Sequence, residues 1–150
     1  MSRALAALVI ALLATGCGGK SHLTKSEYAQ RVTAIYRTLG NSFRNVAPGR
    51  SATDTSAALR KLKRALDQAS AALAKLDPPN DAAAAHRALL EAMRDYAMQV
   101  DLVRASVDLG SPGVIASHLR EVTAPDAVRR ALRELAAKGY RIPVTVASLR

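Results

Sequence analysis

The chain has 150 residues, a formal net charge of +10, one cysteine, no tryptophan and only 3% aromatic residues. This length corresponds to one domain, and the lone cysteine excludes an intrachain disulfide and a Cys-x-x-Cys-His haem attachment. The positive charge favours anionic partners such as lipid headgroups or phosphate-bearing wall polymers, although a merely solvated basic surface is the simpler interpretation.

The first predicted element is a signal peptide over residues 1–16. After the positive charge of Arg3, residues 4–14 form an uninterrupted run of 11 apolar residues. Crossing a bilayer takes about 20 apolar residues, whereas about 7–15 are typical of the hydrophobic part of a signal peptide. Small residues then lead directly to Cys17.

The residues before Cys17 resemble the lipobox of bacterial lipoproteins, in which Leu, a small residue and Gly or Ala precede the cysteine. Here Ala14, Thr15 and Gly16 hold these positions, so the chain departs from the pattern at Ala14. The resemblance implies that signal peptidase cuts between Gly16 and Cys17 and that the Cys17 thiol carries a diacylglyceryl group. Two acyl chains, such as palmitate, give stable membrane anchoring.

A lipidated Cys17 implies an exported protein on the outer face of the cytoplasmic membrane, or facing the periplasm if there is an outer membrane. Export argues against nucleic acid as a partner. Residues 17–22 are predicted to be a flexible tether. Two alternatives stay open: an ordinary secretory signal that discards Cys17, and an uncleaved anchor or buried helix.

A helical domain is predicted over residues 23–139. Thr24 and Glu27 have the spacing of a capping box, and apolar residues three and four positions apart predict a first helix that ends at Pro48. Tyr36 lies off this apolar stripe, so we expect it at a helix–helix edge.

The second predicted helix is capped by Asp54 or a neighbouring Ser or Thr, and it stops at Asp77-Pro78-Pro79. Aliphatic residues recur along it at spacings that alternate between three and four, which is typical of a bundle helix. These residues are Leu59, Leu62, Leu66, Ala69, Leu73 and Leu76.

A third helix of about 28 residues is predicted from Asn80 or Asp81 to the C-terminal glycine Gly110. Its apolar stripe includes His86, Met93 and Tyr96, which could line a pocket. Asp101 and Asp108 flank the stripe without a basic residue four positions later, and we expect both to be solvated.

The fourth helix is predicted to begin at Pro112 and to end at Gly139. Because a proline inside a helix removes a hydrogen bond and clashes with the preceding turn, we expect a break at residues 123–126, around Pro125. Residues 140–150 are expected to form an extended tail lying on the bundle. Together these elements predict an all-α, antiparallel up-down-up-down bundle of about four helices.

The sequence offers no catalytic constellation. His22, His86 and His118 lack the spacing of metal ligands, and no carboxylate pair or nucleophile motif is evident. We therefore expect no metal, no catalytic residues and no cofactor beyond the diacylglyceryl group on Cys17.

The strongest charged feature is the basic cluster of the second helix, a candidate contact for anionic lipid or polymer. A solvated face that covers apolar edges is the alternative. The basic cluster consists of Arg60, Lys61, Lys63 and Arg64.

Three short motifs accompany the lipobox. Residues 23–28 read Leu-Thr-Lys-Ser-Glu-Tyr, residues 76–79 read Leu-Asp-Pro-Pro, and residues 139–140 read Gly-Tyr. Over residues 23–139 the chain thereby resembles a set of small, functionally uncharacterised helical lipoproteins of actinobacteria. Some of these carry paired cysteines that this chain lacks, and the resemblance implies no active site.

The leading hypothesis is a non-enzymatic, membrane-anchored envelope protein that binds a partner protein or envelope component through the surface of its bundle. The alternative is a helical bundle that binds a small ligand or lipid, with a pocket near His86, Met93 and Tyr96. An enzyme is the third hypothesis, and no motif favours it.

Overall fold

The computed structural model describes residues 22–44, 51–110 and 112–143. In these ranges the chain forms α-helices and one short 3-10 helix, with no strand, so the predicted all-α class is confirmed. The lipobox, the expected helix end at Pro48 and residues 144–150 lie outside the described residues. The elements are α1 (Lys25–Arg44), α2 (Ala52–Ala74), η1 (Asn80–Ala82), α3 (Ala83–Asp108), α4 (Pro112–Arg120) and α5 (Ala124–Ala137).

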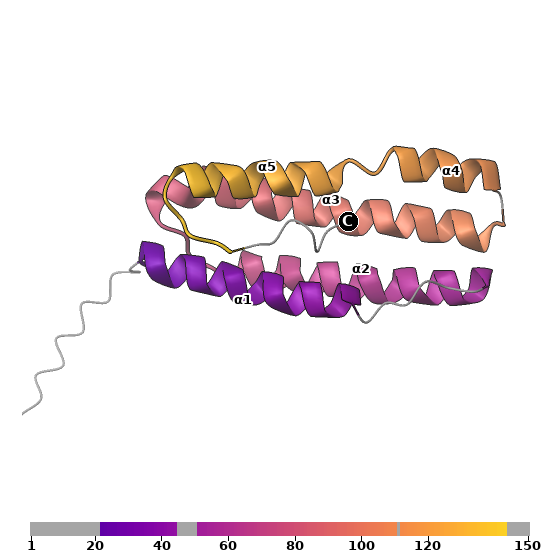
Figure 1. The fold of residues 1–150 in the computed structure, drawn as a ribbon, viewed down its shortest axis with the longest axis horizontal. Helices are drawn as coiled ribbons and strands as arrows, with labels where there is room; N and C mark the ends of the chain where they lie inside the picture. Colours follow the sequence, from indigo (N-terminus) through magenta and orange to yellow (C-terminus); the bar gives the residue numbers. More distant parts are fainter. Residues whose placement is uncertain (1–21, 45–50, 111, 144–150) are drawn as a thin grey trace, which may run out of the picture.

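The central element is α3, which packs against α2 on one side and against α5 and α4 on the other. Figure 1 shows α1 and α2 side by side in one layer, with α3, α4 and α5 in a second layer. α5 lies along the first half of α3 and α4 along its second half (Figure 1).

The helix starts follow from local hydrogen bonds. The backbone N–H of Thr24 donates to Glu27 Oε2 over 2.9 Å, and the N–H of Glu27 donates to Thr24 Oγ1 over 3.3 Å. This is the predicted capping box, and the bonds from Thr24 lower the pKa of the Glu27 carboxyl. At α2 the cap is Ser51, which accepts from the Asp54 N–H over 3.1 Å.

The helix ends also have local causes. Gly110 after α3 and Gly139 after α5 have φ values of +66° and +82°, the left-handed conformation that closes a helix most cheaply in glycine. The break before α5 lies at residues 121–123, slightly earlier than expected. Pro125 lies in the first turn of α5. A backbone N–H has no partner within the helix at this position, so its absence in proline costs no hydrogen bond.

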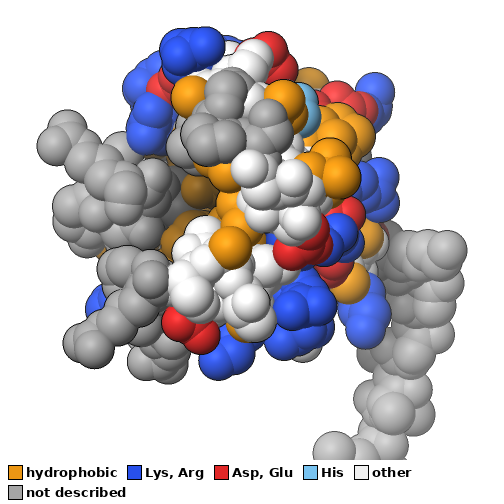
Figure 2. All heavy atoms as spheres, turned by 90° about the vertical axis from the view of Figure 1, so that its right-hand side faces the viewer, with side chains coloured by type: hydrophobic (Ala, Val, Ile, Leu, Met, Phe, Trp, Pro, Cys, Tyr) orange, Lys and Arg blue, Asp and Glu red, His pale blue; other side chains and the backbone are white. Residues whose placement is uncertain are grey.

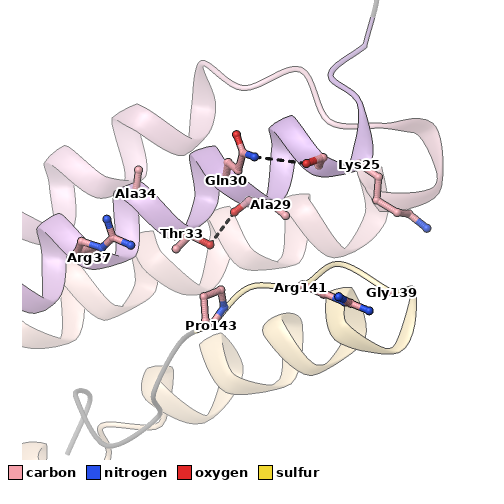
Figure 3. Close-up of a pocket in the computed structure, with 10 residues that line it drawn as sticks. Lys25, Ala29, Gln30, Thr33, Ala34, Arg37, Gly139, Arg141 and Pro143 are labelled. Carbon is pink, nitrogen blue, oxygen red and sulfur yellow. Dashed lines mark hydrogen bonds between the residues drawn. The ribbon is translucent and has the colours of Figure 1, made fainter.

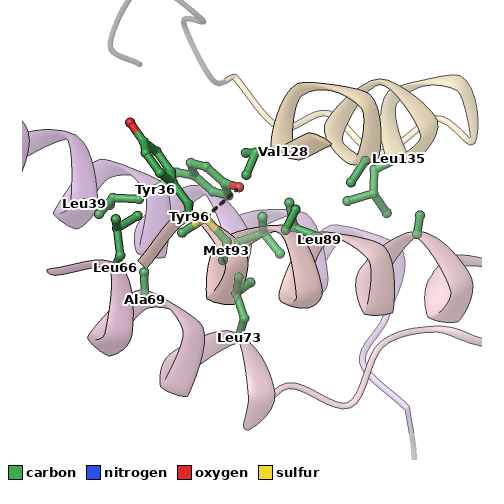
Figure 4. Close-up of a cluster of buried hydrophobic side chains, with 14 of the residues drawn as sticks. Tyr36, Leu39, Leu66, Ala69, Leu73, Leu89, Met93, Tyr96, Val128 and Leu135 are labelled. Atoms are coloured by element: carbon green, nitrogen blue, oxygen red, sulfur yellow. Dashed lines mark hydrogen bonds between the residues drawn. The ribbon is translucent and has the colours of Figure 1, made fainter. Parts of the chain in front are cut away.

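The position of Tyr36 differs from the one expected. Tyr36 is only 6% exposed, and its hydroxyl donates to the Met93 sulfur over 3.8 Å, so it is a core residue rather than a residue of a helix edge. Its long side chain reaches from the flank of the stripe into the space between α1 and α3. Figure 4 shows it there with Tyr96, next to Leu66 of α2.

A second correction concerns the acidic residues of α3. Arg104 Nε lies 2.7 Å from an Asp101 carboxylate oxygen and its Nη1 lies 2.5 Å from one of Asp108. The two carboxylates are therefore paired rather than only solvated. In the sequence, Arg104 lies three positions after Asp101 and four positions before Asp108. Side chains at either spacing are neighbours on the surface of a helix.

Candidate functional site

The tether would join the domain at the end where α1 begins, which we call the near end. Gly16 and Cys17 lie outside the described residues, so the lipid anchor stays a prediction. His22, five positions after Cys17, places its Nδ1 2.9 Å from an Asp77 carboxylate oxygen. The Leu23 N–H donates to the Asp77 carbonyl over 3.0 Å. The start of α1 is thereby held against the connection between α2 and η1.

Of the four residues of the basic cluster, three are exposed and one is half-buried. Arg60, Lys61 and Arg64 are exposed on α2. Lys63 is half-buried, and its ammonium lies 2.7 Å from a carboxylate oxygen of Asp67, one turn further along α2. The hydrogen bond from Lys63 to Asp67 raises the pKa of this lysine. The remaining three cations stay available to an anionic surface.

The residues of the expected pocket lie in the core. His86, Met93 and Tyr96 are all buried, and the cavities of about 690, 380 and 230 Å³ have other linings. His86 Nδ1 lies 3.0 Å from the Tyr28 hydroxyl oxygen. Burial lowers the pKa of His86 and so favours its neutral form.

The largest of these cavities is a groove on the outer side of α1. Its volume is about 690 Å³, and the wall opposite α1 is the C-terminal segment, residues 139–143. We call it the side groove (Figure 3). Among the described residues, this lining holds three cations and no carboxylate, and its other residues are small or polar. The lining consists of Lys25, Ser26, Ala29, Gln30, Thr33, Ala34, Arg37, Gly139, Arg141 and Pro143.

Polar contacts hold the C-terminal segment in place. The Tyr140 hydroxyl donates to Asp81 Oδ1, and Lys25 Nζ lies 3.4 Å from Asp81 Oδ2. The bond from Tyr140 and then the charge of Lys25 lower the pKa of the Asp81 carboxyl. The Lys25 ammonium also donates to the Lys138 carbonyl over 2.7 Å and lies 4.9 Å from the centre of the Tyr140 ring.

Tyr28 links these contacts to the core. Its ring meets the rings of Tyr140 and His86 edge to face, with centroid distances of 5.4 and 5.8 Å, a geometry favoured by the aromatic quadrupole. Burial raises the pKa of Tyr28 to about 12. The near-end cluster is defined by these five residues: Lys25, Tyr28, Asp81, His86 and Tyr140.

This cluster was not predicted, because residue 140 was expected in an extended tail lying on the bundle, with no core position assigned to Tyr140. The side chain is in fact only 2% exposed and belongs to the core. The available signal was an aromatic residue directly after the capping glycine Gly139, a position from which a chain often folds back onto its helix.

Two further findings concern membrane spans and metal sites among the described residues. None of their helices is both long enough and apolar enough to cross a membrane. Nor do they bring three or more His, Asp or Glu side chains together in a group that could hold a metal ion.

Comparison of the chain with protein-family models, with curated proteins and with solved structures gave no match.

Proposed function

We propose that this chain is a lipid-anchored, non-enzymatic protein of the bacterial cell envelope, whose helical domain binds a partner protein or envelope component. The observation that carries the proposal is the position of Cys17. It follows small residues and an apolar run of 11, too short to cross a bilayer and of the right length for a signal peptide. The resemblance to actinobacterial lipoproteins supports the same assignment.

The arrangement we propose for residues 23–139 is an antiparallel up-down-up-down bundle with its last helix broken. Two contacts support it. The Leu23–Asp77 hydrogen bond sets the start of α1 beside the end of α2. The Lys25–Lys138 hydrogen bond sets the start of α1 beside the end of α5. Antiparallel packing of sequential helices is the usual result of short connections.

The partner surface that we assign lies away from the near end. Met98, Leu102 and Leu109 are 56%, 48% and 78% exposed, and their spacing puts them on one side of α3. We call this set the exposed stripe. Hydrophobic side chains reach the surface at the end formed by the last turns of α3 and by α4, with Lys and Arg around them (Figure 2). Apolar residues gathered on one face are typical of an interaction surface.

The anchor is tested by Cys17→Ser in the full chain, with Ser21→Ala as the control. Metabolic labelling with a fatty acid and membrane fractionation are the measurements. Because only a thiol receives the diacylglyceryl group, we expect Cys17→Ser to carry no fatty-acid label. The form that begins at residue 17 should be missing from the membrane fraction. Ser21→Ala should behave like the unmodified chain. Retention of both label and membrane association in Cys17→Ser would overturn the proposal.

A second candidate function is ligand binding, and the side groove favours it. A cavity of about 690 Å³ is within the range of about 300–1,000 Å³ that is usual for small-molecule sites. The candidate site therefore moves from the surroundings of His86 to the outer side of α1.

A further inference from the structure

We propose that the side groove binds an anionic phospholipid, with the phosphate at Arg141 and an acyl chain lying along α1. The proposal deepens the ligand-binding candidate, on which it rests. Three properties of the groove carry it: its charge, its size and surface, and its position in the molecule.

The charge of the groove is positive and largely uncompensated. Of its three cations, only Lys25 contacts a described carboxylate, that of Asp81. Arg37 and Arg141 are exposed, and neither forms an ion pair within the described ranges. The Asp81 carboxylate is already engaged by Tyr140 and Lys25. An arginine without a carboxylate partner is suited to a phosphate, which its guanidinium can bind through two parallel hydrogen bonds.

The surface between the cations is small and mostly apolar. Ala29, Ala34 and the methyl group of Thr33 line the α1 side, and Pro143 lies opposite. The Thr33 hydroxyl is already satisfied, because it donates to the Ala29 carbonyl over 2.7 Å. Apart from the three cations and Gln30, the lining residues are small. Such a surface offers contact to methylene groups.

The length of the groove suits an extended chain better than a compact ion. Along α1 its lining runs from Lys25 to Arg37, which corresponds to about 18 Å at 1.5 Å per residue. Figure 3 shows Arg37 toward one end and Arg141 toward the other, with Pro143 between them. A free phosphate would use one end only, whereas a phospholipid uses the cation and the apolar surface together.

The position of the groove explains why we place the phosphate at Arg141. Arg141 and Lys25 are at the near end, where the tether would arrive. The five residues between Cys17 and Leu23 can span at most about 20 Å. An anchored domain therefore keeps this end of the groove within reach of lipid headgroups. This orientation depends on the anchor, whereas the binding itself does not.

Native mass spectrometry of the full chain in a nonionic detergent tests the proposal. The probes are phosphatidylglycerol, phosphatidylcholine with the same acyl chains, and inorganic phosphate. We expect one phosphatidylglycerol to bind, with phosphatidylcholine at least about 10-fold weaker because a net anionic charge is required. Equal binding of both lipids would overturn the choice of ligand. Binding of phosphate as tight as that of phosphatidylglycerol would show that only the anion is recognised, which also overturns it.

Matched variants locate the site. Arg141→Gln should weaken binding of phosphatidylglycerol about 10-fold or more, and Arg37→Gln should have a smaller effect. Arg87→Gln removes one charge from the exposed surface of α3, outside the groove lining, and should leave binding unchanged. Equal losses from Arg141→Gln and Arg87→Gln would reduce the effect to general surface charge and contradict the site.

A charge-neutral variant tests the apolar surface. Thr33→Phe should fill the groove and abolish lipid binding, provided that circular dichroism shows an unchanged helix content. Unaltered binding in folded Thr33→Phe would overturn the assignment of the acyl chain to α1. If this variant does not fold, the exposed Arg141→Gln still decides the site. Failure here is distinct from failure of the anchor, since a covalent diacylglyceryl group survives denaturation and a bound phospholipid is lost.

Discussion

The two ends of the domain are built differently. At the near end three hydrogen bonds join residues far apart in the sequence: 113 positions for Lys25 and Lys138, 59 for Tyr140 and Asp81, and 58 for Tyr28 and His86. At the far end, formed by the last turns of α3 and by α4, the hydrogen bonds of the described residues span 12 positions or fewer. The near end can therefore close only when the whole chain is folded, whereas the far end can open locally.

This difference matches the proposed division of labour. The near end would face the membrane and carries the side groove, whose opposite wall is kept in position by the near-end cluster. The exposed stripe lies on the second half of α3, away from this cluster. The proposed lipid site would thus lie at the more rigid end of the domain, and the proposed partner surface at the end that opens more easily.

The largest expected effect comes from removing the side chain that closes the near end. Tyr140→Ala should lower the free energy of unfolding by about 3–5 kcal/mol, because this buried ring contacts both Tyr28 and Asp81. Leu109→Ala at the far end, where the side chain is 78% exposed, should stay within about 0.5 kcal/mol. Chemical denaturation measures both. Comparable losses in the two variants would remove the distinction between the ends.

A smaller effect is expected from a single hydroxyl. Tyr28→Phe leaves the buried His86 Nδ1 without its partner at 3.0 Å, and an orphaned buried polar group costs about 1–3 kcal/mol. Tyr36→Phe is the matched control, since it loses only a 3.8 Å contact to sulfur. The prediction fails if Tyr36→Phe destabilises the domain as much as Tyr28→Phe does.

At the far end we expect an effect that is modest and local. Ser106 Oγ lies 2.6 Å from His118 Nδ1 and provides a polar link between α3 and α4. Ser106→Ala should cost about 0.5–1.5 kcal/mol. Amide hydrogen exchange should become faster in α4 and remain unchanged in α1 and α5. Faster exchange throughout the domain would show that the far end does not open independently.

The smallest effect is a pH dependence of stability. Burial lowers the pKa of His86 in the folded state below its unfolded value of about 6.5. As the pH falls through about 6.5 the unfolded chain takes up a proton first, so stability declines until the folded pKa is reached. The lowered pKa values of Asp81 and Glu27 add a further loss below about pH 4. His86→Gln should abolish the first decline and keep the second, as measured by denaturation between pH 7 and pH 3. An unchanged profile in His86→Gln would assign the decline to another group.

The features that could be predicted from the sequence are those with local causes. The capping box at Thr24 and the closing glycines Gly110 and Gly139 depend on residues within a few positions, and the structure has all three. The core positions of Tyr36 and Tyr140 were not predicted, because their partners lie more than 50 residues away in the chain.

The side groove could not be predicted for the same reason. It exists because Tyr140 draws the chain after α5 back against α1, and periodicity within one helix contains no information about that approach. The predicted pocket near His86 relied on a helix stripe alone. Tyr28, which lies on a different helix, is the side chain that contacts this histidine.

The central claim is that Cys17 is the lipidated first residue of the mature protein. The most direct measurement is the intact mass of the protein purified from its native membranes, followed by fragmentation from the N-terminus. We predict a chain that begins at Cys17 and carries a diacylglyceryl group on its thiol. An unmodified Cys17, or a chain that still contains residues 1–16, would contradict the account.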